Sequence, residues 1–98
     1  MTEARSKKNG FAGIAIVTGG GRGLGRAMAL GLLSAGYRVT INDIDDEAIS
    51  DTITAAKSSY GEGRILGVRA DLADSEAAAD LVAQTREKFG GLDVLVNN

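Results

Sequence analysis

Five glycines in eight residues, TGGGRGLG at positions 18–25, constrain the fold of this chain more than any other stretch. They follow an apolar run, GIAIV at 13–17, and Gly13 to Thr18 suits a strand buried on both faces of a parallel sheet. From Gly23 to about Ala35, apolar residues recur at steps of three and four and predict a helix; its expected buried stripe is Leu24, Ala27, Met28, Gly31 and Leu32. A glycine-rich bend before a helix leaves N–H groups bare for an anion, although it could also be a turn without a ligand.

The remaining sequence repeats this alternation of strand and helix. Further strands are predicted at 37–43, 64–70 and 92–98, with helices from about Asp46 to Ser59 and from Asp74 or Ser75 to Phe89. The first of these two helices carries Ala48, Ile49, Thr52, Ile53 and Ala56 on one stripe, and the expected buried stripe of the second is Ala78, Leu81, Val82, Thr85 and Phe89. The alternation predicts an α/β fold with a doubly wound parallel sheet. Right-handed crossovers predict the strand order 3-2-1-4, with the first two helices on one face and the third on the other. Ligands in such sheets bind beyond the carboxyl ends of the strands where the winding reverses, which is where the bend at 18–25 leaves the first strand.

An acidic residue at the end of the second predicted strand indicates a nucleotide. Asp43 lies 18 residues after Gly25, close to the spacing at which dinucleotide-binding sheets place the acid that hydrogen-bonds the adenosine ribose. It could instead only begin the acidic first turn of the next helix, a role that Asp45 fills equally well. A carboxylate at this position accepts hydrogen bonds from ribose hydroxyls and repels a 2′-phosphate, and the next residue, Ile44, supplies no cation. We therefore expect NAD as the cofactor, with NADP as the alternative.

Composition removes several classes of function. The chain has 98 residues and a net charge of −2, and it contains neither cysteine nor histidine. Disulfides, thiolate metal sites and histidine bases are excluded, and there is no basic field for a nucleic acid. No apolar run reaches the roughly 20 residues needed to cross a bilayer. We expect a cytoplasmic protein without metal, membrane or nucleic-acid partners, with a flexible tail at 1–10 and a dinucleotide-binding domain at 11–98.

Three motifs resemble those of the short-chain dehydrogenase/reductase family. The bend is not the ordinary G-x-G-x-x-G, because the sixth position from Gly19 is Leu24; Thr18, Gly19, Gly23 and Gly25 instead form T-G-x-x-x-G-x-G. The segments ADLAD at 70–74 and LDVLVNN at 92–98 follow in the order and spacing of that family, the latter ending in the first half of its N-N-A-G motif. The resemblance covers residues 11–98.

The resemblance implies a Rossmann-type domain of an NAD(P)-dependent oxidoreductase, with an alcohol or ketone substrate of which a 3-oxoacyl compound is one kind, and a homodimer or homotetramer. It places Asp71 on the adenine and Asn97 beside the adenosine, whereas the residues alone permit a loop aspartate and a polar strand end. Arg22 occupies a position that is often basic in NADP-binding members, and its alternative is an exposed loop cation. The candidate cofactor-binding residues are Thr18, Gly19, Gly21, Arg22, Gly23, Leu24, Gly25, Asp43, Ile44, Asp71, Leu72, Asn97 and Asn98.

The family's catalytic Y-x-x-x-K motif has no counterpart in these 98 residues. Tyr37 is followed four positions later by Ile41, and Tyr60 by Arg64, which we expect to open the third strand and point to solvent. We therefore expect no catalytic residue here: the catalytic groups would lie beyond Asn98, in a protein of which this chain is a fragment that is inactive alone.

Two other functions are compatible with parts of the pattern. A non-catalytic nucleotide-binding protein could keep this fold without the chemistry. An S-adenosylmethionine-dependent methyltransferase could use the G-x-G-x-G spacing of Gly19, Gly21 and Gly23, but the acid usual two residues before the first glycine is replaced by Val17.

Overall fold

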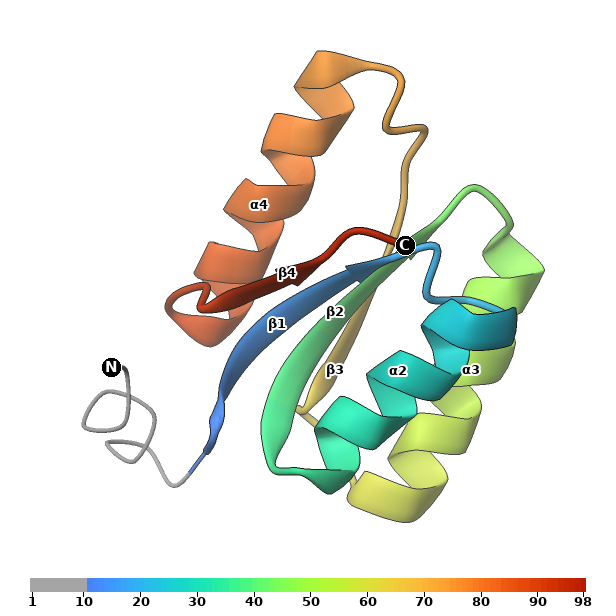
Figure 1. Ribbon diagram of the computed structural model, residues 1–98, viewed down its shortest axis with the longest axis vertical. Coiled ribbons are helices and arrows are strands. Elements are labelled where there is room, and N and C mark those ends of the chain that lie inside the picture. Colours follow the sequence, from blue (N-terminus) through green and yellow to red (C-terminus); the bar gives the residue numbers. More distant parts are fainter. Residues whose placement is uncertain (1–10) are drawn as a thin grey trace.

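The computed structural model describes residues 11–98, so the tail predicted at 1–10 lies outside the described part (Figure 1). Strands and helices alternate along the chain as the sequence predicts. In order, they are β1 (Gly13–Thr18), α2 (Gly23–Ser34), β2 (Tyr37–Asp43), α3 (Asp46–Tyr60), β3 (Ile65–Arg69), α4 (Ser75–Phe89) and β4 (Val94–Val96). No helix in this part of the chain is long and apolar enough to span a membrane.

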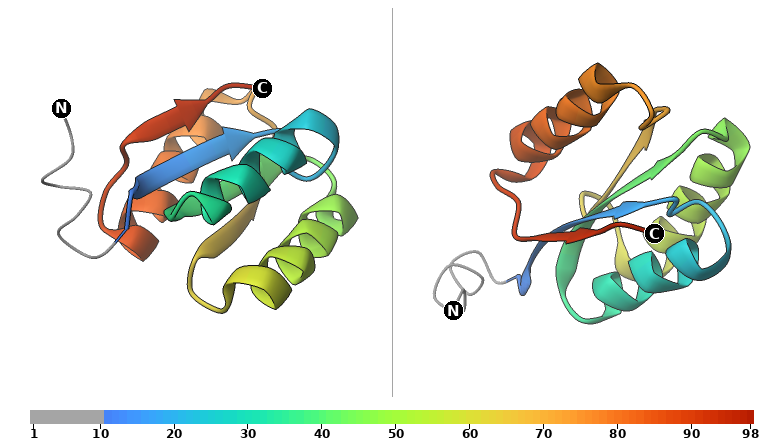
Figure 2. Two further views of the ribbon diagram at one scale, coloured as in Figure 1. Left: turned by 60° about the horizontal axis from the view of Figure 1, so that its bottom comes forward. Right: turned by 45° about the horizontal axis from the view of Figure 1, so that its top comes forward.

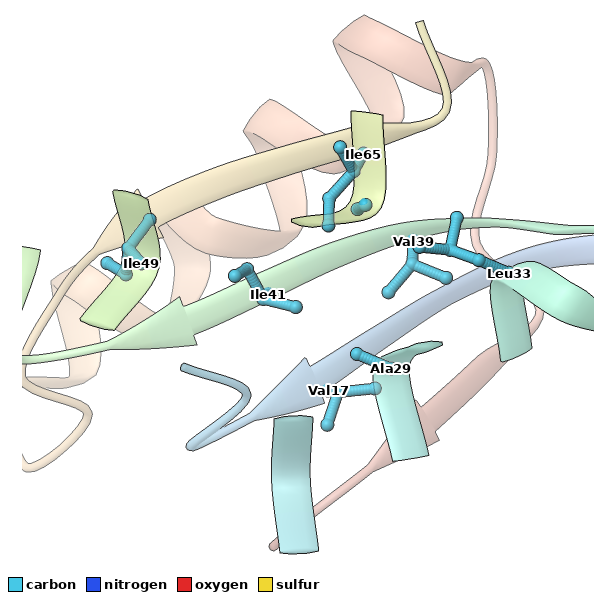
Figure 3. Close-up of a cluster of buried hydrophobic side chains, with 8 residues drawn as sticks. Val17, Ala29, Leu33, Val39, Ile41, Ile49 and Ile65 are labelled. Atoms are coloured by element: carbon cyan, nitrogen blue, oxygen red, sulfur yellow. The ribbon is translucent and has the colours of Figure 1, made fainter. Parts of the chain in front are cut away.

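The four strands form one parallel sheet in the order β3-β2-β1-β4, which confirms the predicted topology. Helices α2 and α3 lie on one side of this sheet and α4 lies on the other (Figures 1 and 2). The first side holds the larger apolar cluster, in which Val17, Val39 and Ile41 of the sheet pack with Leu33 and Ile49 of the helices (Figure 3). Ile16, Val68 and Leu81 form a second cluster under α4.

Helices α3 and α4 begin and end with residues that suit helix termini. Asp45 precedes α3 and accepts hydrogen bonds from the N–H groups of Glu47 and Ala48, and Asp74 precedes α4 and accepts one from Glu76. Gly90 ends α4 in the left-handed region, with φ of 91°. The Asp45 and Asp74 side chains bond N–H groups that a helix start otherwise leaves unpaired, so both helices are stabilised locally as well as by packing on the sheet.

The predicted buried face of α2 is wrong by one position. Gly25, Ala29 and Leu33 are buried, whereas Leu24, the first residue of the predicted stripe, is 69% exposed. Helix α2 is apolar on nearly all sides, so the three- and four-residue spacing could not distinguish one stripe from its neighbour. The rotation of α2 is set by Gly25, whose missing side chain lets the helix approach the carbonyl of Gly19.

Arg64 does not point to solvent, which corrects a second expectation. Its Nη2 donates hydrogen bonds to the carbonyl oxygens of Leu33, at 2.7 Å, and Tyr37, at 2.8 Å. The last turn of α2 contains no basic residue, and the guanidinium of Arg64, just before β3, adds a second donor to the Leu33 carbonyl, which already accepts from the N–H of Gly36 at 3.0 Å. Arg64 therefore ties α2 to the starts of β2 and β3, at the end of the sheet opposite the glycine-rich bend.

Candidate functional site

An open pocket of about 280 Å³ lies at the carboxyl ends of the strands. Residues that follow or end all four strands contribute to it, because parallel strands present these ends at one edge of the sheet. The lining residues are Thr18, Gly19, Asn42, Asp43, Ile44, Ala70, Leu72, Asn97 and Asn98. The sequence predicted all of these except Asn42 and Ala70.

The two residues that the sequence did not identify are linked to each other. The Asn42 amide Nδ2 donates hydrogen bonds to the carbonyl oxygens of Val68, at 3.3 Å, and Ala70, at 3.0 Å. Asn42 thereby fixes the chain as it leaves β3 and positions one wall of the pocket. The sequence offered one indication of Asn42, which is a polar residue next to the end of an otherwise buried strand, beside Asp43.

The glycines of the bend are required for different structural reasons. Gly19 and Gly23 have positive φ values of 63° and 57°, which other residues rarely adopt. A β-carbon on Gly20 would lie 2.8 Å from Ile41 Cγ2, and one on Gly21 would lie 2.8 Å from Asp43 Oδ2. At Gly20, Gly21 and Gly25, the protein itself therefore occupies the space of a side chain. A β-carbon on Gly23 would meet no protein atom within 4 Å, so the chain is open to a ligand at this position.

The start of α2 differs from the starts of the other two helices. Arg22 precedes it in extended conformation, its side chain makes no capping hydrogen bond, and the first turn contains no acidic residue. The first N–H groups of the helix therefore keep their hydrogen-bonding capacity, and the positive end of the helix dipole is not neutralised. This arrangement fits the diphosphate of a dinucleotide.

Asp43 is 6% exposed and its carboxylate is surrounded by donors. Oδ2 accepts from the N–H of Gly21 at 3.2 Å, while Oδ1 accepts from the N–H groups of Ile44, at 2.8 Å, and Asp45, at 3.2 Å. Burial by itself raises the pKa of this carboxyl, but the hydrogen bonds from Asp45, Arg22, Gly21 and Ile44 outweigh it, and the pKa is lowered from 3.8. Asp43 is therefore a fixed anion at the mouth of the bend.

Arg22 lies against this carboxylate rather than free in solution. Its Nη2 is 3.2 Å from Asp43 Oδ1 and 3.6 Å from Asp45 Oδ2. The Arg22 side chain is 62% exposed, so solvent weakens both ion pairs. The arginine can leave Asp43 at little cost when another anion approaches.

Polar groups join the ends of β1 and β4 beside the pocket. Thr18 Oγ1 accepts a hydrogen bond from the N–H of Asn98 at 2.9 Å and lies 3.2 Å from Asn97 Oδ1. The Asn98 amide Nδ2 donates to the carbonyl of Gly19 at 3.4 Å. These contacts hold the asparagine pair next to the start of the bend.

Several predicted residues lie outside the pocket. Asp71 is exposed, its Oδ1 accepts from the N–H of Ala73 at 3.0 Å, and it forms a turn before α4; contact with an adenine stays a prediction. Leu72 is half-buried and lines the pocket, whereas the exposed Leu24 does not. No group of acidic residues in 11–98 is arranged to hold a metal ion.

Known proteins resemble this chain in sequence and structure. The short chain dehydrogenase family model matches residues 13–98. The short chain dehydrogenase/reductase dpmpG of Macrophomina phaseolina is 39% identical over 100% of this chain, which spans 56% of that protein. The 3-oxoacyl-[acyl-carrier-protein] reductase of Synechocystis is 37% identical over 87% of this chain, which spans 34% of its length.

A solved structure, the Pseudomonas aeruginosa RhlG/NADP active-site complex, superimposes with a TM-score of 0.77 and is 44% identical, covering 90% of this chain and 34% of the RhlG chain. The chain thus spans between about a third and slightly more than half of the length of each of these relatives. The parallel sheet, the T-G-x-x-x-G-x-G bend and the family match agree, and the chain belongs to the short chain dehydrogenase family.

Proposed function

We propose that residues 11–98 bind the adenosine diphosphate part of a nicotinamide dinucleotide, in a protein that transfers hydride between this cofactor and an alcohol or ketone. The observation that carries the proposal is the junction of β1 and α2. There, an uncapped helix start and a glycine with open space beside it lie next to a buried carboxylate. The diphosphate would contact the first N–H groups of α2, and the ribose would contact Asp43.

The other candidate residues would surround the adenosine. Ile44 and Leu72 supply apolar surface to the pocket, and Asn97, Asn98 and Thr18 supply polar groups on its other side. We place the adenine between these two sets, with Asp71 at its edge. The groups that act on the substrate are proposed to lie outside these 98 residues, because the sequence holds no Y-x-x-x-K motif.

We further propose NAD rather than NADP as the preferred cofactor. A 2′-phosphate would lie beside Asp43, which is ionised at neutral pH and repels it. Arg22 supports the alternative, since it could exchange Asp43 for the phosphate, and the RhlG structure contains NADP. Titration of the chain with each dinucleotide tests the choice, and tighter binding of NADP would overturn it.

For the substrate we propose a carbonyl or alcohol, with 3-oxoacyl compounds as one kind because the Synechocystis relative is named for them. The protein is proposed to be cytoplasmic and to form a homodimer or homotetramer.

The diphosphate site is tested by comparing Gly23→Ala with Gly90→Ala. Both glycines have positive φ, of 57° and 91°, and neither would place a β-carbon within 4 Å of a protein atom. Both variants should therefore lose stability similarly, by about 1 kcal/mol. Gly23→Ala should bind NAD at least tenfold more weakly in calorimetric titration, whereas Gly90→Ala, at the end of α4, should bind it normally. Equal affinities in the two variants would overturn the proposed site.

A further inference from the structure

Gly21, in the middle of the bend, is held at both of its polar backbone groups. Its N–H donates to Asp43 Oδ2 at 3.2 Å, and its carbonyl oxygen accepts from Thr52 Oγ1 at 2.9 Å. A β-carbon on Gly21 would lie 3.0 Å from Ala48 Cβ, so the first half of α3 also packs closely against this residue. The position of Gly21 thus depends on α3 as well as on the end of β2.

Thr52 is 0% exposed and belongs to the buried stripe of α3, which is how the sequence accounts for it. Packing alone does not require a hydroxyl at this position, because valine has nearly the same shape. A buried carbonyl left without a donor is costly, however, and Thr52 is the donor to Gly21. The hydroxyl therefore has a partner outside its own helix, in the bend that faces the pocket.

We propose that Thr52 is a positioning residue for the nucleotide site: its hydroxyl fixes Gly21, whose N–H orients the Asp43 carboxylate toward the adenosine ribose. The inference deepens the proposed function and rests on it. The carbonyl and the N–H of Gly21 belong to the two peptide planes that meet at its Cα, so loss of the Thr52 hydroxyl frees one plane and weakens the restraint on the other, which carries the N–H bonded to Asp43 Oδ2. The carboxylate then loses the hydrogen bond that holds Oδ2, although Oδ1 keeps those from Ile44 and Asp45, and it binds the ribose less well, while Thr52 itself never touches the nucleotide.

Thr85 provides a matched control on the opposite side of the sheet. It is also 0% exposed, and its Oγ1 lies 2.9 Å from both Thr40 Oγ1 and the carbonyl of Leu81. Thr85→Val therefore removes a buried hydroxyl from a helix that packs on the sheet, but it leaves the bend untouched. Any general effect of such a change on packing should appear in both variants.

The test compares AMP with 2′-deoxy-AMP, which lacks one ribose hydroxyl, as ligands of the 98-residue chain. The unmodified chain should bind AMP about fivefold more tightly than 2′-deoxy-AMP, and Thr85→Val should keep this ratio. Thr52→Val should bind AMP about fivefold more weakly and reduce the ratio to about twofold or less. Thr52→Ser, which keeps a hydroxyl, should restore the ratio. A loss of stability alone would not change the ratio of the two affinities in a folded variant, because it would affect the binding of both ligands equally.

The outcomes separate this inference from the proposed function. If the unmodified chain prefers AMP over 2′-deoxy-AMP and Thr52→Val keeps the full preference, Thr52 does not act through Asp43 and the inference is wrong. If the unmodified chain binds no AMP, or binds both ligands equally, the proposed nucleotide site itself is wrong. Should circular dichroism show Thr52→Val to be unfolded, Thr52→Ala, which also lacks the hydroxyl and is smaller, takes its place; full preference in that variant would equally overturn the inference.

Discussion

Two glycines of α2 have opposite requirements although they belong to one helix. A β-carbon on Gly25 would overlap the carbonyl of Gly19 and lie 2.6 Å from Asn98 Nδ2, whereas one on Gly31 would meet nothing within 4 Å. We predict that Gly25→Ala destabilises the chain by about 2 kcal/mol, because helix and bend must separate. Gly31→Ala should stabilise it by about 0.5–1 kcal/mol, through the lower entropy of the unfolded chain.

Urea unfolding of the two variants measures this difference. A Gly25→Ala variant as stable as the unmodified chain would show that α2 can move away from the bend without cost, and the structural account of that glycine would be wrong.

The hydrogen bonds to Asp43 predict how stability changes in acid. Its pKa is lower in the folded chain than the ordinary value of 3.8, so its ionisation contributes stability that is complete above this value and is lost as pH falls through the folded pKa. We predict that part of the acid sensitivity below about pH 4 belongs to this one group. Urea unfolding at pH 7 and pH 3 should show a larger loss in the unmodified chain than in Asp43→Asn. Equal losses would contradict the assignment.

At the scale of elements, α2 lacks the cap that α3 and α4 possess. Arg22 has the extended backbone of an N-cap residue, with φ of −155° and ψ of 168°, so a serine there could bond the first N–H groups. We predict that Arg22→Ser is more stable than Arg22→Ala by about 1 kcal/mol. The same hydroxyl should compete with a diphosphate, so Arg22→Ser should bind NAD about threefold more weakly than Arg22→Ala.

Both variants lack the arginine and its ion pair with Asp43, so their comparison isolates the cap. Thermal unfolding and calorimetric titration supply the two measurements. A variant that gains stability without losing affinity would show that the start of α2 does not face the diphosphate.

The elements themselves were largely predictable from the sequence. The bounds of β1 and β2 agree with prediction because each is an apolar or β-branched run that ends at glycines or acids. The stripes of α3 and α4 are correct since charged residues mark their outer faces, as Glu47 and Glu76 do. The face of α2 was not predictable, because it is fixed by the contact between Gly25 and the bend and not by the pattern of apolar residues.

Across the whole molecule, the strands of the sheet differ in how much of their length is paired. Strand β2 pairs on both sides over most of its length, while β4 contributes only Val94–Val96 and pairs only with β1 among residues 11–98. We predict that backbone amides of β4 exchange with deuterium faster than those of β2. Because Asn97 and Asn98 line the pocket, saturating NAD should slow exchange in β4 more than in β2. Exchange in β4 that does not respond to NAD would count against the asparagine pair as part of the site.

The candidate site was predictable in its location and less so in its construction. Topology alone places the ends of the four strands together, and motif spacing selects Asp43 and the asparagine pair. The links between them depend on side-chain directions that no spacing reveals. Asn42 holds the exit of β3 and Thr52 holds the bend, and in the sequence both look like ordinary interior polar residues.

Asn42 and Asp43 are consecutive, and their side chains leave β2 in opposite directions, one toward the exit of β3 and the other toward the bend. Inserting or deleting a single residue in β2 would exchange the two directions and bring an amide to the place of the anion. The number of residues in this strand is therefore as strictly limited as their identity. Natural variation in chain length should accumulate instead in exposed connections such as 61–63.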